Sequence, residues 1–455
     1  MMRRERFALR LGLLLSIVVT AGSAAMAQPC VGVDERAAVE AVRTRIDGFG
    51  ELAWPGWTGA PPMVVRSGDV DCLLAHPAPP AGFVAEGPGV ARLDGHLLPV
   101  PAATAFEVGG VWSVAVPARA ELQAFVDEHL GRGLVVLDEA LYQRTLLHEA
   151  FHAFQMTVMG GPAGVPDFGT GPAASLADVA ADAAFDAAQT AQGAALYEAL
   201  MAPTAGEAVA AVERFLQARD AWRAVAPEGT AALERQLEWL EGTARYADVL
   251  LALIPAPEPL GRVDDAWGPL LAQVRDPSAV ATGERDRYAA LGAVQAFVLD
   301  RLHPGWRTRA IPGGASLETL LRAVVEGNAG VPAPLGSMAV RTVVLDGVRW
   351  RVAVADAPEH WAQGLQDVTV FGSVDGVWFV FPEDVEAPFW MRGARLPLDI
   401  AFFDHDGRWL TTRTMPTCGA EPCPTYRPDR PYRSALETLS GRLVARGPSG
   451  PLTAP

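Results

Sequence analysis

The spacing of apolar residues changes along the chain and predicts where helices give way to strands. From about 118 to 254, apolar residues recur every three or four positions, which is the period of one face of an α-helix. The same period returns after residue 286. We therefore expect helices near 119–131, 138–159, 173–201, 205–224, 230–253, 286–303 and 315–326.

Strand-like patterns lie on both sides of this helical region. Residues 28–110 combine many prolines and glycines with short apolar runs, which favours short strands and loops, and 111–116 is typical of a strand. Beyond residue 339, apolar runs alternate with turn residues, and Asp-His-Asp-Gly at 404–407 predicts a hairpin turn. The expected strands of this last region are 340–345, 350–355, 376–381, 399–403 and 409–415.

A stretch rich in glycine, proline and alanine separates the two patterns. Residues 327–336 have the composition of a linker. We predict an α+β protein, with a mainly helical N-terminal domain at 28–330, a linker at 331–339 and a small strand-rich α+β domain at 340–455. Because each pattern is long enough to build its own core, we expect the two domains to be separable.

The first 27 residues read as a cleaved secretory signal peptide. Four arginines form a basic start, residues 11–19 form an apolar core too short to span a bilayer, and small residues precede Gln28. The pair Arg3-Arg4 hints at twin-arginine export, but the residues that follow fit that pattern poorly. No later stretch reaches about 18 uninterrupted apolar residues. We expect an exported protein, periplasmic or extracellular, with no stable membrane anchor after cleavage.

Cysteine number and net charge narrow the classes of partner and chemistry. Four cysteines in an exported chain favour disulfides over a zinc–thiolate site, because their spacings match no finger or ribbon. Cys418 and Cys423 can close a small loop, which leaves Cys30 and Cys72 to pair, although three connectivities are formally possible. Loss of the signal, with four arginines and one glutamate, takes the net charge from −16 to −19. Nucleic acid is therefore not an expected partner.

The pentapeptide His-Glu-Ala-Phe-His at 148–152 carries the strongest chemical signal in the chain. On a helix, His148 and His152 lie one turn apart and point to one spot, as two ligands of a zinc ion would. Glu149 lies between them, where it can take a proton from a metal-activated water. With its uncharged flanks the segment resembles zinc-dependent metallopeptidases of the zincin type. The alternative is a pair of histidines on a packed helix.

A catalytic zinc ion needs a third protein ligand and an open position for water. No further histidine follows at short spacing, so a glutamate on a second helix is the expected third ligand. The segment 241–246, Glu-Gly-Thr-Ala-Arg-Tyr, resembles the glutamate-donating helix of gluzincin peptidases, which implies Glu241 as the third ligand. Glu238 is the alternative ligand, and a solvated charge is the alternative role for Glu241. Gly242 and Ala244 would let this helix approach the motif helix closely.

A peptidase also needs a hydrogen-bond donor for the oxyanion of the transition state. Tyr246 lies on the helix of Glu241, but the offset of five residues turns it some 140° away. Tyr288 opens a segment that resembles the helix following the glutamate in such domains. A tyrosine packed at a helix junction is the alternative role for both. Three aspartates at 178, 182 and 186 are expected to form a solvated stripe rather than a second cation site.

The last part of the chain resembles the bacterial family called domain of unknown function 192. The residues that carry the likeness include Gln-Gly-Leu at 363–365, Phe-Trp-Met-Arg at 389–392 and Ala-Leu-Glu at 435–437. Gln366 and Gly393 depart from the residues usual in the family. Trp390, Met391 and Asp399 are candidates to line a pocket, or else to form an aromatic core and cap a turn. The resemblance implies no activity.

Together these features predict an exported zinc metallopeptidase that acts on peptide or protein substrates. His148, His152 and Glu241 are the expected ligands of Zn²⁺, and Glu149 is the expected general base. The alternative is a non-catalytic envelope protein that keeps the scaffold as a binding or docking module. The pattern indicates neither the cleavage specificity nor the oligomeric state.

Overall fold

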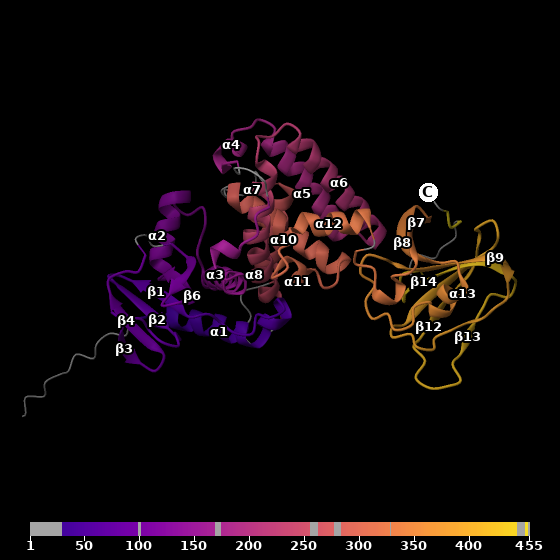
Figure 1. Cartoon of the computed structure of the whole chain (residues 1–455), viewed down its shortest axis with the longest axis horizontal. Helices are drawn as coiled ribbons and strands as arrows, with labels where there is room; N and C mark the ends of the chain where they lie inside the picture. Colours follow the sequence, from indigo (N-terminus) through magenta and orange to yellow (C-terminus); the bar gives the residue numbers. More distant parts are fainter. Residues whose placement is uncertain are drawn as a thin grey trace, which may run out of the picture.

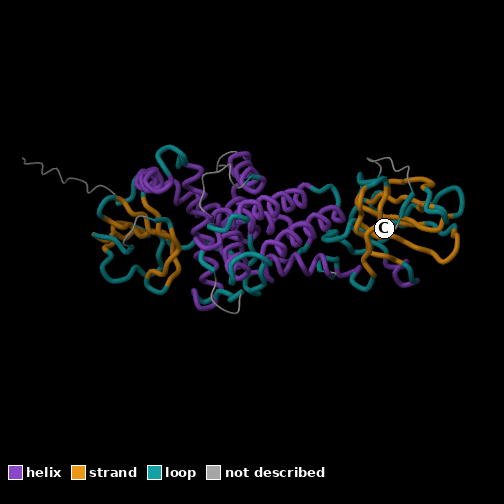
Figure 2. Tube along the Cα trace, turned by 90° about the horizontal axis from the view of Figure 1, so that it is seen from above, coloured by secondary structure: helices purple, strands orange, loops and turns teal. Residues whose placement is uncertain are grey.

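The computed structural model describes residues 30–98, 102–168, 174–254, 263–276, 284–327, 329–443 and 451–453. The predicted signal peptide at 1–27 lies outside this part of the chain. Figures 1 and 2 show three parts in a row: an N-terminal sheet, a set of helices, and a C-terminal strand-rich domain. The fold is α+β, as the pattern predicts. None of the described helices is long and apolar enough to cross a membrane.

A six-stranded mixed sheet forms the N-terminal part. Its strand order is β3-β4-β2-β1-β6-β5, in which β1 and β6 run parallel and the other pairs run antiparallel. Side chains alternate between its faces, so Met63 and Val65 enter the main core while Val64 joins a small cluster on the other face. The strands are β1 (Met63–Ser67), β2 (Val70–Leu74), β3 (Val84–Gly87), β4 (Val90–Asp94), β5 (Thr104–Val108) and β6 (Val111–Pro117).

A helix before this sheet was not predicted. α1 (Val33–Ala53) occupies residues for which we expected only short strands and loops. Val39, Val42 and Ile46 recur at helical spacing on it, and each is fully buried. Residues 33–47 contain no proline or glycine, so the periodic signal was present and was masked by the average composition of residues 28–110.

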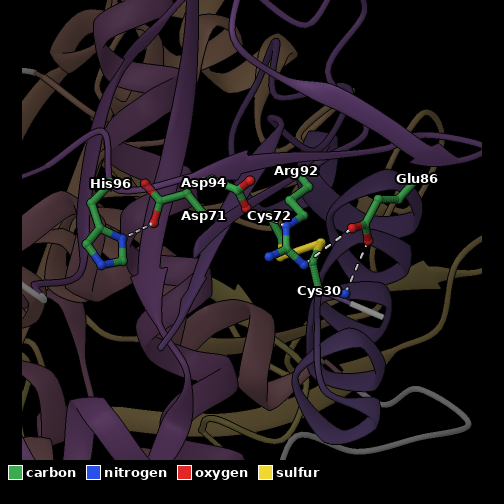
Figure 3. The surroundings of a disulfide bond; sticks show 7 residues. All are labelled: Cys30, Asp71, Cys72, Glu86, Arg92, Asp94 and His96. Carbon is green, nitrogen blue, oxygen red and sulfur yellow. Dashed lines mark hydrogen bonds and ion pairs between the residues drawn. A yellow bond between two sulfur atoms is a disulfide. The ribbon is translucent and has the colours of Figure 1, made fainter. Parts of the chain in front are cut away.

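The first disulfide ties α1 to the sheet (Figure 3). Cys30, just before α1, is bonded to Cys72 of β2, with a Cα–Cα distance of 5.9 Å. The backbone N–H of Cys30 also donates to Glu86 at 3.2 Å, and Glu86 pairs with Arg92. A second disulfide joins Cys418 and Cys423. Both pairings are those that the sequence favours.

The helical part surrounds the motif helix α3 (Glu139–Met159). Asp138 caps its start by accepting from the N–H of Leu141, and Gly160 ends it with a φ of 72°. α3 packs against β6, α1 and α8. The other helices are α2 (Arg119–Leu130), α4 (Leu176–Ala180), α5 (Phe185–Met201), α6 (Ala205–Arg223), α7 (Thr230–Leu237), α8 (Thr243–Leu253), α9 (Val263–Arg275), α10 (Glu284–Leu302), α11 (Trp306–Ala310) and α12 (Leu317–Glu326).

Two helical predictions need correction. The helix expected at 173–201 is two helices, α4 and α5, because the chain turns at 181–184. The helix expected at 230–253 contains a π-helical turn, η2 (Glu238–Gly242), between α7 and α8. Such turns are rare and frequently occur at functional sites.

The C-terminal domain is a second six-stranded sheet, in the order β12-β11-β14-β9-β8-β7, with β8 and β9 parallel. The hairpin turn expected at 404–407 joins β11 to β12, and Gly407 N–H donates to the carbonyl of Asp404. Strand β14, which we did not predict, lies in the middle of this sheet. The elements are β7 (Ala339–Leu345), β8 (Val348–Ala355), α13 (Pro358–Gln363), β9 (Gly376–Val385), β10 (Phe389–Trp390), β11 (Leu398–Phe403), β12 (Trp409–Met415), β13 (Thr425–Tyr426) and β14 (Tyr432–Leu439).

Buried polar contacts join the C-terminal domain to the helices. The carboxylate of Asp375 accepts from the first two N–H groups of α6, at Ala205 (2.7 Å) and Gly206 (3.0 Å). The guanidinium of Arg351 donates to the carbonyl of Val324, at the end of α12. In the segment predicted as a linker, Leu335 is fully buried within the C-terminal core. The boundary is therefore a packed junction.

Loss of the Cys30–Cys72 disulfide should destabilise the protein more than loss of the other disulfide. The first closes a loop with a sequence separation of 42 residues and the second closes one of 5, so the first restricts the unfolded chain more strongly. We expect Cys30→Ser/Cys72→Ser to lower the free energy of unfolding by about 2–5 kcal/mol. Denaturant unfolding of both double variants measures this, and a larger loss in Cys418→Ser/Cys423→Ser would contradict it.

Candidate metal centre

The two histidines of the motif converge as the helix spacing predicts. His148 and His152 lie four residues apart on α3, and their Nε2 atoms are 3.1 Å from each other. Both rings are largely shielded from solvent, with side-chain exposures of 20% and 12%. The two ring nitrogens therefore face one small volume at the surface of α3.

Glu241 supplies a third ligand atom to the same volume. Its Oε2 lies 3.5 Å from Nε2 of His148 and 3.5 Å from Nε2 of His152. Ligand atoms bound at about 2.1 Å to a tetrahedral ion are about 3.4 Å apart, so all three spacings fit one ion. Within the described residues, this is the group of histidine, cysteine and acidic side chains that could hold a metal.

The π-helical turn η2 and its packing present Glu241. A Cβ atom on Gly242 would lie 2.5 Å from the Cα of Gly292, so α10 approaches this turn at backbone distance. We expected Gly242 to allow close approach to the motif helix, and the structure corrects this to α10. Arg285, at the start of α10, donates to Oε1 of Glu241 at 2.5 Å, which leaves Oε2 to face the histidines.

Gln155 orients His152 and was not identified from the sequence. Its Nε2 donates to the carbonyl of Leu240 (3.0 Å) and to Oγ1 of Thr243 (2.8 Å), so its Oε1 is the atom that faces Nδ1 of His152, at 2.6 Å. Since Oε1 can only accept, Nδ1 carries the proton and Nε2 keeps its lone pair for a metal. The i, i+3 spacing from His152 on one helix was the available signal.

Asp248 orients His148 in the way that Gln155 orients His152. Its Oδ2 lies 3.3 Å from Nδ1 of His148, and its Oδ1 accepts from Arg144 at 3.1 Å. Asp248 is two turns after Glu241 on the continuous helix formed by η2 and α8, so it lies on the same face. That spacing could have identified it. A carboxylate behind a ligating histidine is the usual partner in zinc sites.

The charges at this site favour a bound cation. Burial alone would lower the pKa of His148, but the carboxylates of Asp248, Glu241 and Glu149 raise it to about 10. Burial would likewise raise the pKa of Glu241, yet its contacts with His148 and His152 hold it far below its usual range. Positive charge is thus stabilised where the three ligand atoms meet.

Glu149 lies beside the ligands without belonging to them. Its side chain is half-buried, and it raises the pKa of His148 and of Arg285 through its charge. Among the residues that the structure describes, it forms no hydrogen bond or ion pair. Its carboxylate is therefore free to act on a water at the site, and its role as a base stays a prediction.

The two tyrosines lie in other surroundings. Tyr246 is fully buried among Trp54, Trp306 and Phe297, and its hydroxyl donates to Asp300 at 2.6 Å. Tyr288 is buried in a separate apolar cluster. In the described structure neither hydroxyl contacts His148, His152 or Glu241, so the placement gives the proposed oxyanion role no support.

Burial and contacts distinguish between the alternative roles of the acidic residues. Glu238 is 1% exposed, and its carboxylate forms a buried ion pair with Arg219 (2.8 Å). It is not part of the group formed by His148, His152 and Glu241. Glu241 is likewise buried, which excludes a solvated charge. Of the three aspartates, Asp178 bonds to Ser175, Asp182 caps the turn before α5, and Asp186 pairs with Arg287. They form no cation site among the described residues.

Comparison with known proteins identifies one domain of the chain. Residues 341–447 match the family described as DUF192, Uncharacterized ACR, so the chain carries a DUF192 domain, as the resemblance implied. No metallopeptidase family matches the chain. No curated protein matches it.

Two solved structures are similar to part of the chain. One is a candidate transcription regulator from Sinorhizobium meliloti 1021, with 25% identity over 26% of this chain and 95% of that chain, and a TM-score of 0.23. The other is a protein of unknown function from Novosphingobium aromaticivorans DSM 12444, with 24% identity over 28% of this chain and 92% of that chain, and a TM-score of 0.24.

Glu241 and Glu238 offer a matched test of the third ligand, because both are buried glutamates on the same turn. We expect Glu241→Gln to weaken zinc binding by more than the roughly 10–100-fold that outer-shell changes cost. Glu238→Gln should keep the parental affinity, since its carboxylate bonds to Arg219. Competition with a chromogenic chelator measures both affinities. The reverse order of losses would show that the third ligand is misassigned.

The orienting role of Gln155 can be tested without a change of charge. Gln155→Met leaves Nδ1 of His152 without its acceptor, so we expect zinc affinity to fall by about 10–100-fold. Gln143→Met is the control, because Gln143 is a buried residue of the same helix that bonds to Glu139. Equal zinc affinities of the two variants in the same chelator competition would contradict this role.

Proposed function

We propose that the protein is an exported zinc metallopeptidase, periplasmic or extracellular, that hydrolyses peptide bonds. The observation that carries the proposal is the set of spacings of 3.1, 3.5 and 3.5 Å among the ligand atoms of His148, His152 and Glu241. A site of two histidines and one glutamate is typical of catalytic zinc, because a fourth position stays open for water. Two disulfides are compatible with export.

Each side chain has a separate task in this proposal. His148, His152 and Glu241 hold the ion, and Asp248 and Gln155 keep the imidazoles in the ligating orientation. A zinc ion held there would supply Lewis-acid chemistry, which would lower the pKa of a water toward neutrality. Glu149 takes that proton during attack on the scissile carbonyl and later passes it to the leaving amine.

The position of β5 supports a peptide as the substrate. β5 forms an edge of the N-terminal sheet and contacts the motif helix α3. An edge strand presents unpaired backbone groups to which an extended peptide can add as a further strand. A substrate bound along β5 would therefore run past the helix that carries His148 and Glu149.

Removal of the base should separate metal binding from hydrolysis. We expect Glu149→Gln to retain zinc and to lose at least about 100-fold in turnover, because general-base catalysis typically contributes that much or more. Glu139→Gln is the control, since Glu139 lies on the same helix, in its first turn. The measurement is the digestion of a peptide library by zinc-loaded parent and variants, with and without a chelator.

The outcomes also distinguish the alternative function. Parental turnover by Glu149→Gln on a peptide that the parent cleaves would contradict the mechanism. A zinc-loaded parent that cleaves no peptide would instead favour a non-catalytic binding or docking protein on this scaffold.

A further inference from the structure

A cavity lies in the DUF192 domain, on the apolar face of the C-terminal sheet. Its volume is about 390 Å³, which is within the range of small-molecule sites. Trp390 and Met391 line it, as one interpretation of the sequence expected, whereas Asp399 does not: its carboxylate bonds to Thr414 and to the N–H of Leu443. Six aromatic residues line the cavity, namely Trp361, Phe379, Phe381, Phe389, Trp390 and Tyr432.

Glu437 is the acidic residue of this aromatic cavity. It lies on the central strand β14, where its neighbours across the sheet are Val377 of β9 and Ile400 of β11, both fully buried. Glu437 itself is 4% exposed. Its side chain has neither a hydrogen bond nor an ion pair with any residue that the structure describes. A buried carboxyl group without a partner is costly and points to a ligand.

The chain above Glu437 is shaped to leave its carboxyl group accessible to the cavity. Gly364 has a φ of 46°, and a Cβ atom there would lie 3.3 Å from Phe379 and 3.9 Å from Oε2 of Glu437. The first distance is tight, so a larger residue would press on the aromatic wall, whereas the second is an ordinary contact that would fill the space beside the carboxyl group. Glycine at this position keeps the space over Glu437 open.

The basic residue that lines this cavity, Arg392, is paired with a residue other than Glu437. Arg392 lines the cavity, but its guanidinium donates to Glu421 at 2.6 Å and is 68% exposed. Burial alone raises the pKa of Glu437 to about 8, with no cation of the protein to lower it. The cavity therefore lacks the positive charge that its carboxyl group would bind.

We propose that this cavity binds a small organic cation, an ammonium or guanidinium group on an apolar body. The cationic group would pair with Glu437, and the apolar body would pack against the aromatic walls. Aromatic faces attract cations, and a desolvated ion pair in such a cage favours a charged ligand over its neutral analogue. This site is independent of the metal centre and of the proposed peptidase activity.

The test compares three ligands of similar shape and different charge on the full-length mature protein. Benzylammonium is the cationic probe, benzyl alcohol the neutral one and benzoate the anionic one. We expect benzylammonium to bind at least about 10-fold more tightly than benzyl alcohol, with benzoate weaker still. Titration calorimetry measures the affinities.

Two variants locate the binding. Glu437→Gln should abolish the preference for benzylammonium, because it removes the carboxyl group that pairs with the cation. Asp384→Asn removes an exposed carboxylate of the same domain that pairs with Arg433 and does not line the cavity, so it should leave the preference unchanged. The proposal fails if the parent binds benzyl alcohol or benzoate as tightly as benzylammonium. It fails equally if it binds none of the three, or if Glu437→Gln keeps the preference.

Discussion

The approach of α3 to the π-helical turn η2 is the constraint on which the candidate metal centre depends. Two ligands belong to one helix and the third to the other, so their spacing is set by how closely the two segments pack. Gln155 spans this junction, because its carbonyl oxygen orients His152 while its amide bonds to Leu240 and Thr243. The buried side chain of Gln155 thus positions both His152 and the backbone next to Glu241.

Further packing behind this junction holds the two segments together. Asp248 connects His148 to Arg144 and Arg245, so the charge behind the histidine is compensated inside the protein. On the other side, Gly242 and Gly292 let α10 reach the turn at backbone distance, which brings Arg285 to Glu241. Each of these polar groups would be costly to bury without a partner. Because they pair with one another, the network stabilises the site.

The sequence predicted the local part of the site and missed the part that depends on packing. His148 and His152 follow from helical spacing, and Glu241 from a short motif, because both signals lie within a few residues. Gln155 and Asp248 also had spacing signals, but their roles appear only when two helices are brought together. Tyr246 was a candidate because it lies on the helix of Glu241, and Tyr288 because its segment resembles the helix that follows the glutamate. Tertiary packing places Tyr246 in an aromatic cluster and Tyr288 in a separate apolar cluster instead. In the same way, β14 is central in its sheet because of pairings with β9 and β11, which no local pattern specifies.

Anomalous diffraction from crystals grown with zinc tests the central claim most directly. Data collected on both sides of the zinc absorption edge locate the ion without reference to activity. We predict one site per chain, with the ion about 2.0–2.2 Å from Nε2 of His148, Nε2 of His152 and a carboxylate oxygen of Glu241. An ion bound elsewhere would contradict the account. The account would also be contradicted if crystals saturated with zinc showed no anomalous peak between these three side chains.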